Sequence, residues 1–163
     1  MEVSVRTVRL FDAVRLFRWA NDKESRENSL DREPIRLIEH LRWFWLSALR
    51  ERSRHLIIQL TRDGLRATPV MICRFSKISD QKYKISINMD PEFRGKGLSN
   101  PLLSAGIEHF RRSQDSETTI CAEVRVENLA SQKLFSGLGF THLDTDAEIV
   151  VLEKRFPISY DAT

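Results

Sequence analysis

A short glycine-containing segment, 90–100, carries the residues best suited to chemistry in this chain. Its centre is the run Arg-Gly-Lys-Gly at 94–97, which follows the alternating apolar run 83–89 and precedes a helix-like apolar run. Backbone N–H groups in such a turn, together with the positive end of the following helix, attract phosphate or pyrophosphate. The two cations would neutralise that anion. The segment therefore predicts a site for a phosphate-bearing cofactor.

Three kinds of phosphate loop were compared with this segment. A dinucleotide-binding loop needs a third glycine where Asn100 stands, and the P-loop pattern is absent. The segment resembles the pyrophosphate loop of the GNAT N-acetyltransferases, whose pattern is Arg/Gln-x-x-Gly-x-Gly/Ala. Arg94, Gly97 and Ser99 occupy the three fixed positions. Ser99 replaces the usual glycine or alanine, but it is small enough to allow close backbone approach.

A second segment, 127–140, resembles the Asn-x-x-Ala/Ser…Gly-Phe helix of the same family. Asn128 is a suitable N-cap, and Gly139 suits the left-handed position after a helix. A strand-like run, 120–126, comes just before it, and the helix lies about thirty residues after the loop. Through both motifs the chain is identified as a GNAT acetyltransferase.

The resemblance implies acetyl-CoA as cosubstrate and direct attack of an amine on its thioester carbonyl. Backbone groups at the end of the strand before the loop would hold the pantetheine like an added strand, with an N–H near the carbonyl oxygen. The residues expected to bind acetyl-CoA are Ile87, Asn88, Met89, Arg94, Gly95, Lys96, Gly97, Leu98, Ser99, Asn128 and Ser131.

The groups that transfer protons are less obvious. Relatives with a strand base carry it at the position of Tyr83, which is no base near neutral pH. Glu123 lies in an otherwise apolar run, where burial would raise its pKa toward neutrality and suit it to act as the base. An ion pair with Arg125, without a catalytic role, is an equally weighted alternative. His40 is a second candidate, and a position on the surface of its helix is the alternative. Many relatives have a tyrosine as general acid at the position of Phe135, so water or another residue would protonate the thiolate here.

The amine is expected to bind in the N-terminal half. This half contains the runs Trp19-Ala20-Asn21-Asp22 and Glu39-His40-Leu41-Arg42-Trp43-Phe44. In these runs it resembles the subgroup that acetylates the 4-amino group of a UDP-linked amino sugar on the pseudaminic-acid pathway. Relatives that modify protein N-termini or small amines share its features, and a non-catalytic acyl-CoA-binding module is a further alternative. The arginines clustered in this half suit a diphosphate and argue against a polyamine acceptor. A solvated helical surface is the alternative for most of them. The predicted acceptor residues are Trp19, Asn21, Arg26, Arg36, His40 and Trp43.

The order of periodic segments predicts a mixed α/β fold. A mostly antiparallel sheet of about seven strands flanked by about four helices is expected, as the family fold would require. The segment 21–31 reads as irregular, and Asp63-Gly64 and Ser79-Asp80 as turns. The expected strands are 3–10, 55–60, 69–77, 82–89, 118–126, 139–144 and 147–155, and the expected helices are 12–19 capped by Asp12, 34–49, 101–112 capped by Asn100, and 128–138.

Composition sets the remaining expectations. The 163 residues fit a single acetyltransferase domain, 1–163, and the 41% hydrophobic and 30% charged residues are typical of a soluble protein. A net charge of +3 does not suggest nucleic acid, and no apolar run suggests a membrane span or a signal peptide, which favours the cytoplasm. Cys73 and Cys121 read as buried, inert thiols. No metal site is predicted, and a homodimer is an option.

Overall fold

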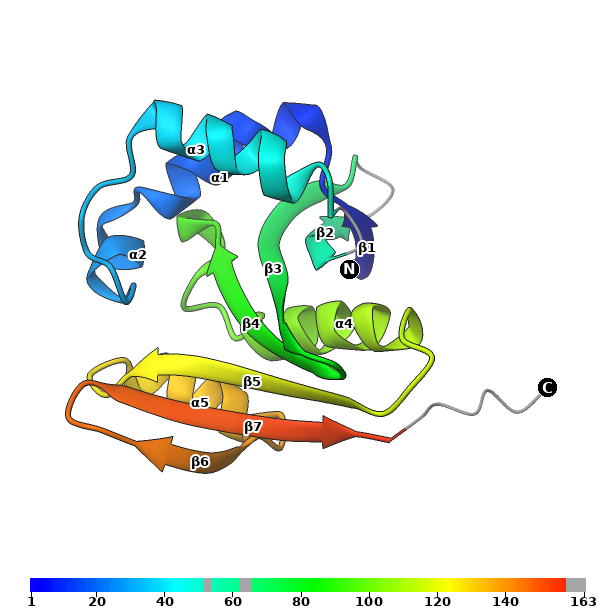
Figure 1. Ribbon diagram of the computed structural model, residues 1–163. Helices are drawn as coiled ribbons and strands as arrows, with labels where there is room; N and C mark the ends of the chain where they lie inside the picture. The colour runs from blue at the N-terminus through cyan, green and yellow to red at the C-terminus, as the bar shows by residue number, and fades with distance from the viewer. Residues whose placement is uncertain (52–53, 62–65, 158–163) are drawn as a thin grey trace.

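The computed structural model describes residues 1–51, 54–61 and 66–157. Its strands form one sheet in the order β1-β2-β3-β4-β5-β7-β6 (Figure 1). Neighbouring strands pair antiparallel except β4 and β5, which are parallel. The predicted seven-stranded, mostly antiparallel sheet is therefore confirmed. The strands are β1 (Glu2–Thr7), β2 (His55–Thr61), β3 (Thr68–Ser79), β4 (Lys82–Met89), β5 (Thr118–Arg125), β6 (Thr141–Thr145) and β7 (Ile149–Phe156).

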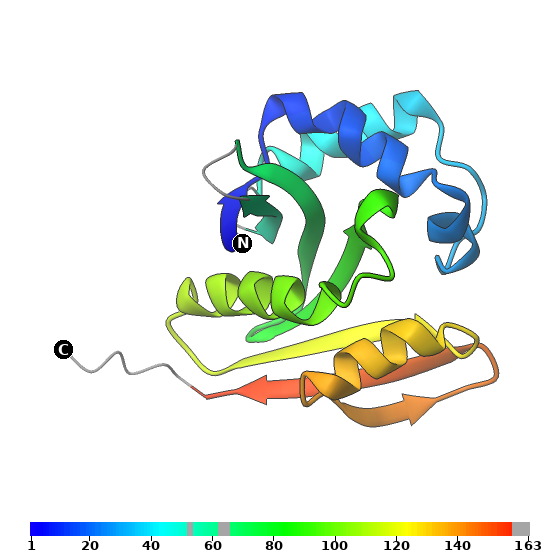
Figure 2. The same cartoon turned by 180° about the vertical axis from the view of Figure 1, so that it is seen from behind.

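Helices cover both faces of the sheet. Helices α1 and α3 lie over one face of β1–β4, and α4 and α5 lie on the opposite face (Figures 1 and 2). A π-helical turn, Phe44–Ala48, continues α3. The helices are α1 (Ala13–Ala20), α2 (Lys23–Glu27), α3 (Leu37–Trp43), α4 (Ser99–Arg112) and α5 (Leu129–Gly137). None of the described helices has the length and apolar character needed to cross a membrane.

Side-chain alternation along the strands divides the interior into two cores. Phe75 and Ile85 face α4, where Phe110 stacks on Phe75 with ring centroids 3.8 Å apart. Ile57 and Ile72 face the other side and pack under α1 and α3. Cys73 and Cys121 are buried free thiols, as predicted, and burial raises the pKa of both.

Three local predictions near the N-terminus and at the turns need correction or comment. The carboxylate of Asp12 does not cap α1; it is buried and accepts hydrogen bonds from the Arg6 guanidinium at 2.7 and 2.8 Å. The segment predicted to be irregular contains α2, because Asp22 caps it by accepting from the Ser25 N–H. The predicted turn at Ser79–Asp80 joins β3 to β4, whereas Asp63-Gly64 lies outside the described residues.

The junction of β4 with β5 shapes the site. Their parallel pairing covers three residue pairs and ends at Lys84 and Cys121. Beyond that point β4 continues to Met89 and β5 to Arg125, and the two strands diverge (Figure 1). One edge of the last five residues of β4 is therefore left without a neighbouring strand.

Helix α4 begins closer to the glycine loop than predicted. Its first residue is Ser99 and its N-cap is Leu98, so the prediction that Asn100 caps the helix is wrong. Pro101 sits inside the first turn, where its missing N–H costs no hydrogen bond. The positive end of the helix thus lies directly at the loop.

Candidate active site

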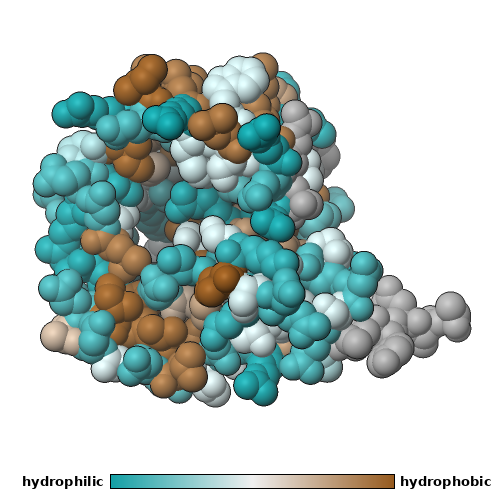
Figure 3. Space-filling view, in the orientation of Figure 1, coloured by the Kyte–Doolittle hydropathy of each residue, from teal (hydrophilic) through white to brown (hydrophobic). Residues whose placement is uncertain are grey.

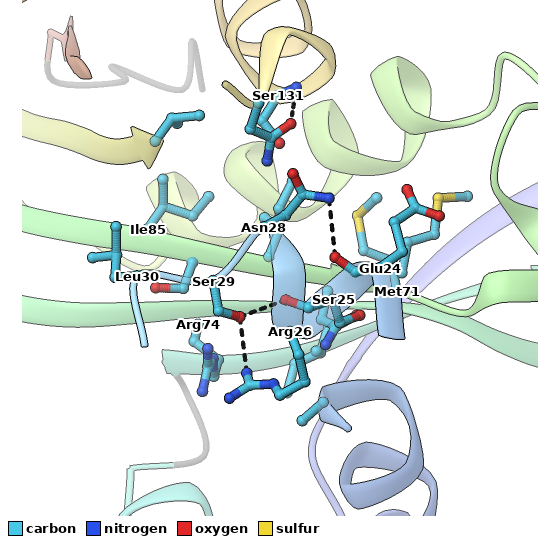
Figure 4. Close-up of a pocket in the computed structure, with 18 of the residues that line it drawn as sticks. Glu24, Ser25, Arg26, Asn28, Ser29, Leu30, Met71, Arg74, Ile85 and Ser131 are labelled. Carbon is cyan, nitrogen blue, oxygen red and sulfur yellow. Dashed lines mark hydrogen bonds between the residues drawn. The ribbon is translucent and has the colours of Figure 1, made fainter. Parts of the chain in front are cut away.

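A cavity of about 730 Å³ opens where β4 and β5 diverge. Its walls come from β3, β4, β5, α1, α3, α5, the glycine loop and the segment that links α1 to α3. The space-filling view shows a hollow between the α1–α3 layer and β5, with hydrophilic residues along much of its rim (Figure 3). Figure 4 shows its interior, with Ser131 toward one end and Arg26 and Arg74 toward the other. We call these the cofactor end (Gly95, Ser99, Asn128 and Ser131) and the acceptor end (Arg26, His40, Trp43, Arg74 and Ser86).

The glycine loop has the conformation that its composition predicts. Gly95 and Gly97 have φ of 68° and 69°, in the left-handed region that favours glycine. A Cβ atom added at either position would meet nothing within 4 Å, so the space beside both glycines is open. Gly95 and Ser99 line the cavity. Lys96, Gly97 and Leu98 do not line it, and the Lys96 ammonium lies over the Phe93 ring at 5.4 Å.

Arg94 does not present a free charge to an incoming phosphate, contrary to the prediction. Its guanidinium donates to the carboxylates of Asp22 and Glu24 and, at 2.8 Å, to the hydroxyl of Ser25. It also donates twice to the Met89 carbonyl, at 3.0 and 3.2 Å. Arg94 therefore fixes the start of the loop against α2, and backbone N–H groups are left as the anion donors.

The end of β4 combines a free edge with anchored side chains. Ile87 and Asn88 pair with β3 on one side, and β5 has diverged on the other. The Asn88 side chain donates to the Trp19 carbonyl at 3.0 Å and accepts from Ser25 at 3.2 Å. The Met89 carbonyl already accepts two hydrogen bonds from the Arg94 guanidinium. Backbone groups at Ile87 and Asn88 therefore remain as the predicted contacts for an extended ligand.

Helix α5 forms the opposite wall of the cofactor end. Asn128 caps it by accepting from the Ser131 N–H at 3.0 Å, and both residues line the cavity. Gly139 follows the helix with φ of 81°, as predicted. Phe135 is buried, packs against Phe140 with ring centroids 5.1 Å apart, and carries no ionisable group.

This geometry agrees with the family comparison. Residues 2–141 match the family described as acetyltransferase (GNAT) domain. The chain belongs to the GNAT acetyltransferase family. The acyltransferase class predicted from the two motifs is thereby confirmed. The matched family description names no subgroup and no acceptor.

Solved structures share this GNAT fold at low sequence identity. Spermidine N-acetyltransferase from Vibrio cholerae, solved with CoA and spermine, has a TM-score of 0.78 at 14% identity, covering 94% of this chain and 95% of that one. Ribosomal-protein-alanine N-acetyltransferase from Brucella melitensis has 0.71 at 18%, covering 94% and 99%. A putative acetyltransferase from Salmonella typhimurium, solved with acetyl-CoA, has 0.67 at 17%, covering 99% and 96%. No curated protein sequence matches the chain significantly.

Glu123 lines the GNAT cavity from β5, but its ion partner is not the predicted one. The Lys84 ammonium donates to its carboxylate at 3.1 Å, across the point where β4 and β5 separate. The two side chains are 33% and 36% exposed, so the carboxylate is not isolated from water. Arg125 contacts Glu127 instead, at 3.5 Å. Glu123 is therefore an ion-paired carboxylate at the edge of the cavity, and its role as base stays a prediction.

His40 is a buried residue at the acceptor end rather than a helix-surface histidine. Its Nε2 lies 2.8 Å from the Ala13 carbonyl, which can only accept, so Nε2 carries the proton and Nδ1 holds the lone pair. Burial lowers the pKa of His40; the Ala13 hydrogen bond opposes that shift, and the charge of Arg74 adds to it. A neutral ring with Nδ1 as its basic atom is the form expected near neutral pH.

The structure separates the other predicted acceptor residues into two groups. Arg26 and Trp43 line the cavity, as His40 does. Trp19, Asn21 and Arg36 do not, and each has another place in the fold.

The places of these three residues follow from packing. Trp19 is 4% exposed in the core under α1 and α3, so it cannot stack on a substrate ring. Asn21 holds the backbone of Ile35, donating to its carbonyl at 3.1 Å and accepting from its N–H at 2.8 Å. Arg36 is exposed at the N-cap of α3. Trp19 and Asn21 thus have structural contacts in place of the predicted stacking and binding, and Arg36 lies outside the cavity.

Arg74 is the residue at the acceptor end that sequence reasoning missed. It lies in the middle of β3 and lines the cavity, with its guanidinium 5.5 Å from the centre of the Trp43 ring. Its sequence signal was a single charged residue inside the apolar run 70–75. An unpaired charge within a buried strand is costly, and such a position indicates function.

Proposed function

We propose that this protein is an acetyl-CoA-dependent N-acetyltransferase that acts on a primary amine by direct attack in a ternary complex. The observation that carries the proposal is the divergence of β4 and β5 at Lys84 and Cys121, with a left-handed glycine loop at the far end of β4. This arrangement offers an unpaired strand edge and a helix N-terminus along one ligand-sized path. Relatives solved with CoA or acetyl-CoA support the same choice of cosubstrate.

In the proposed complex, the diphosphate of acetyl-CoA rests on backbone N–H groups between Gly95 and the first turn of α4. The pantetheine runs along Ile87 and Asn88, and the thioester lies in the cavity near Glu123. Binding both substrates in one cavity supplies most of the acceleration through positioning, and an N–H of β4 stabilises the oxyanion.

Proton transfer is assigned to groups that line the cavity. Glu123, directly or through a water molecule, takes the proton that the substrate ammonium must lose before the neutral amine attacks. His40 is the second candidate because its Nδ1 is basic. Each would contribute about 10²–10⁴-fold. Phe135 cannot donate a proton, so a water molecule relays to the departing thiolate of CoA the proton that the newly acylated nitrogen loses.

The proposed acceptor is the 4-amino group of a UDP-linked amino sugar. Arg26 at the acceptor end suits a diphosphate, and the Trp43 ring offers a stacking surface for a base or sugar. A protein N-terminus or another small amine is the second candidate. It is favoured by the fold shared with a ribosomal-protein-alanine N-acetyltransferase.

The test is release of free thiol from acetyl-CoA in the presence of single acceptors. Turnover with UDP-4-amino sugars but not with peptides or simple amines would support the first candidate. Turnover with peptides alone would support the second. Absence of turnover with every amine, combined with absence of calorimetric heat from CoA, would refute the enzymatic proposal.

A further inference from the structure

Two arginines at the acceptor end have guanidinium groups that the described residues do not fully satisfy. The Nε atoms of Arg26 and Arg74 are the buried side-chain polar atoms without a hydrogen-bond partner in the described part of the chain. Among the same residues, neither arginine forms an ion pair. Buried donors without partners are rare and costly, so their presence here needs an explanation.

Arg74 is the more unusual of the two. Its side chain makes no hydrogen bond with any described residue, and its guanidinium lies over the Trp43 ring, 5.5 Å from the ring centre. Burial lowers the pKa of Arg74, and the charge of Arg26 lowers it further, so the two cations lie close enough to repel each other. Figure 4 shows the two side chains next to each other at the wall of the cavity.

Arg26 is held in place without being neutralised. Its guanidinium donates to the Ser29 hydroxyl at 2.8 Å and to the carbonyls of Asp31 and Glu33 at 3.3 and 3.1 Å. These neutral acceptors fix the direction of the group and leave its full positive charge. The pair therefore resembles a pre-organised anion site, in which the missing partner is a ligand.

The carboxylates of the cavity do not fill this role. Glu24 contacts Arg94, and Glu123 contacts Lys84. Asp31 accepts from the backbone N–H of Glu33, and Glu39 from that of Arg36. The acid groups around the cavity thus have other partners.

Arg74 lies on the face of the sheet that α1 and α3 cover, away from the glycine loop of the cofactor end. Arg74 pairs in register with Ser86 of β4, and Ile72, two residues earlier on the same face, packs under α1 and α3. The glycine loop lies beyond the end of β4, at the start of α4. An anion between Arg26 and Arg74 would therefore belong to the acceptor and not to acetyl-CoA.

We propose that Arg26 and Arg74 form an anion site that anchors a phosphoryl or carboxylate group of the acceptor. The anion would accept hydrogen bonds from both guanidinium groups and remove their mutual repulsion. This rests on the proposed function in one respect, namely that the amine binds in this cavity. It goes further in requiring that the acceptor carry negative charge at a distance from the amine.

The test is calorimetric titration of the CoA-saturated protein with three probes: UDP, inorganic pyrophosphate and malonate. CoA occupies the glycine loop, so the titration reports the second site. Wild type should bind at least one probe saturably, and Arg74→Gln and Arg26→Gln should each weaken that binding about tenfold or more, with CoA affinity unchanged. Arg36→Gln, at an exposed arginine outside the cavity, is the matched control and should bind as wild type does.

The probes also distinguish the source of the anion. Preference for UDP or pyrophosphate indicates a phosphoryl group, and preference for malonate indicates a carboxylate; either result supports the site. No saturable binding of any probe, or equal binding by Arg74→Gln and wild type, would overturn it. A protein that fails to bind CoA refutes the proposed function separately, because CoA binding is measured first in the same cell.

A stability measurement separates this role from a structural one. The side chain of Arg74 makes no hydrogen bond within the described residues and is repelled by Arg26, so Arg74→Gln should not lower the melting temperature of the ligand-free protein. With CoA saturating the glycine loop, the probe that binds wild type most tightly should raise the melting temperature of wild type and leave that of Arg74→Gln unchanged. A marked destabilisation of ligand-free Arg74→Gln, with no effect on anion binding, would show that the residue is structural.

Discussion

The guanidinium of Arg94 donates a hydrogen bond to the carboxylate of Asp22, 72 positions earlier in the chain. This contact joins the start of the glycine loop to the cap of α2, the short helix that also carries Arg26. The loop that would bind acetyl-CoA and the helix that would contact the acceptor are therefore mechanically linked. Ser25, which also contacts Asn88, strengthens that link.

Replacing Asp22 by Asn should weaken CoA binding without dissolving α2. Asparagine caps a helix as well as aspartate does, so the Ser25 N–H keeps its acceptor while Arg94 loses one of its two carboxylate partners and keeps Glu24. A charge-assisted hydrogen bond contributes about 1.5–3 kcal/mol, and we expect CoA affinity measured by calorimetry to fall about fivefold or more. Glu27→Gln, which removes an exposed pair with Lys23, should have no effect. Equal CoA affinity in Asp22→Asn would show that the link is not needed to shape the loop.

Gly97→Val should strain the loop and obstruct the approach of the diphosphate. The position has φ of 69°, which costs a β-branched residue about 1–3 kcal/mol, and the open space beside it would be filled. We expect both the free energy of unfolding and CoA affinity to decrease, the latter at least tenfold. Gly139→Val is the control, because its φ of 81° imposes similar strain away from the loop and cavity. It should lose stability alone; a similar loss of CoA affinity there would point to a global effect.

Glu123→Gln should reduce kcat about 10²–10⁴-fold if the carboxylate is the base, with CoA affinity preserved. Thiol release over a range of acceptor concentrations separates kcat from KM. Glu153→Gln provides a matched control, since Glu153 accepts from Lys82 at 2.6 Å in a similar cross-strand ion pair outside the candidate active site. Unchanged turnover in Glu123→Gln would transfer the role to His40.

Stability should decrease as the pH falls below 6.5 because of two histidines. Burial lowers the pKa of His40 and His55 in the folded protein, whereas the unfolded chain keeps the ordinary value of 6.5. The unfolded state therefore takes up more protons below pH 6.5, and the stabilisation present above that value is lost progressively. Urea unfolding at pH 7.5 and 5.5 should show this loss, at most about 1.4 kcal/mol per pH unit for each histidine.

Substitution of each histidine tests whether that residue causes the pH dependence of stability. His40→Gln and His55→Gln should each reduce the slope of stability against pH, and the double variant should reduce it further. A slope that neither variant changes would place the titration elsewhere in the chain.

Local chemistry along the sequence determined much of this protein. The left-handed glycines at 95 and 97, the Asn128 cap of α5 and the strand periodicities depend on neighbouring residues, which is why their conformations were predictable. The cofactor end of the cavity follows from these local signals. Its loop, the strand before it and the helix after it are consecutive in the chain.

Only the tertiary structure decided which charges are neutralised. Arg94 was predicted to face a phosphate and is held by Asp22, while Arg74, inside an apolar run, has no acid beside it. Trp19 was predicted to contact substrate and is buried in the core. Partners of this kind are brought together by packing between distant segments, and the spacing of residues along a chain does not encode which long side chains will meet.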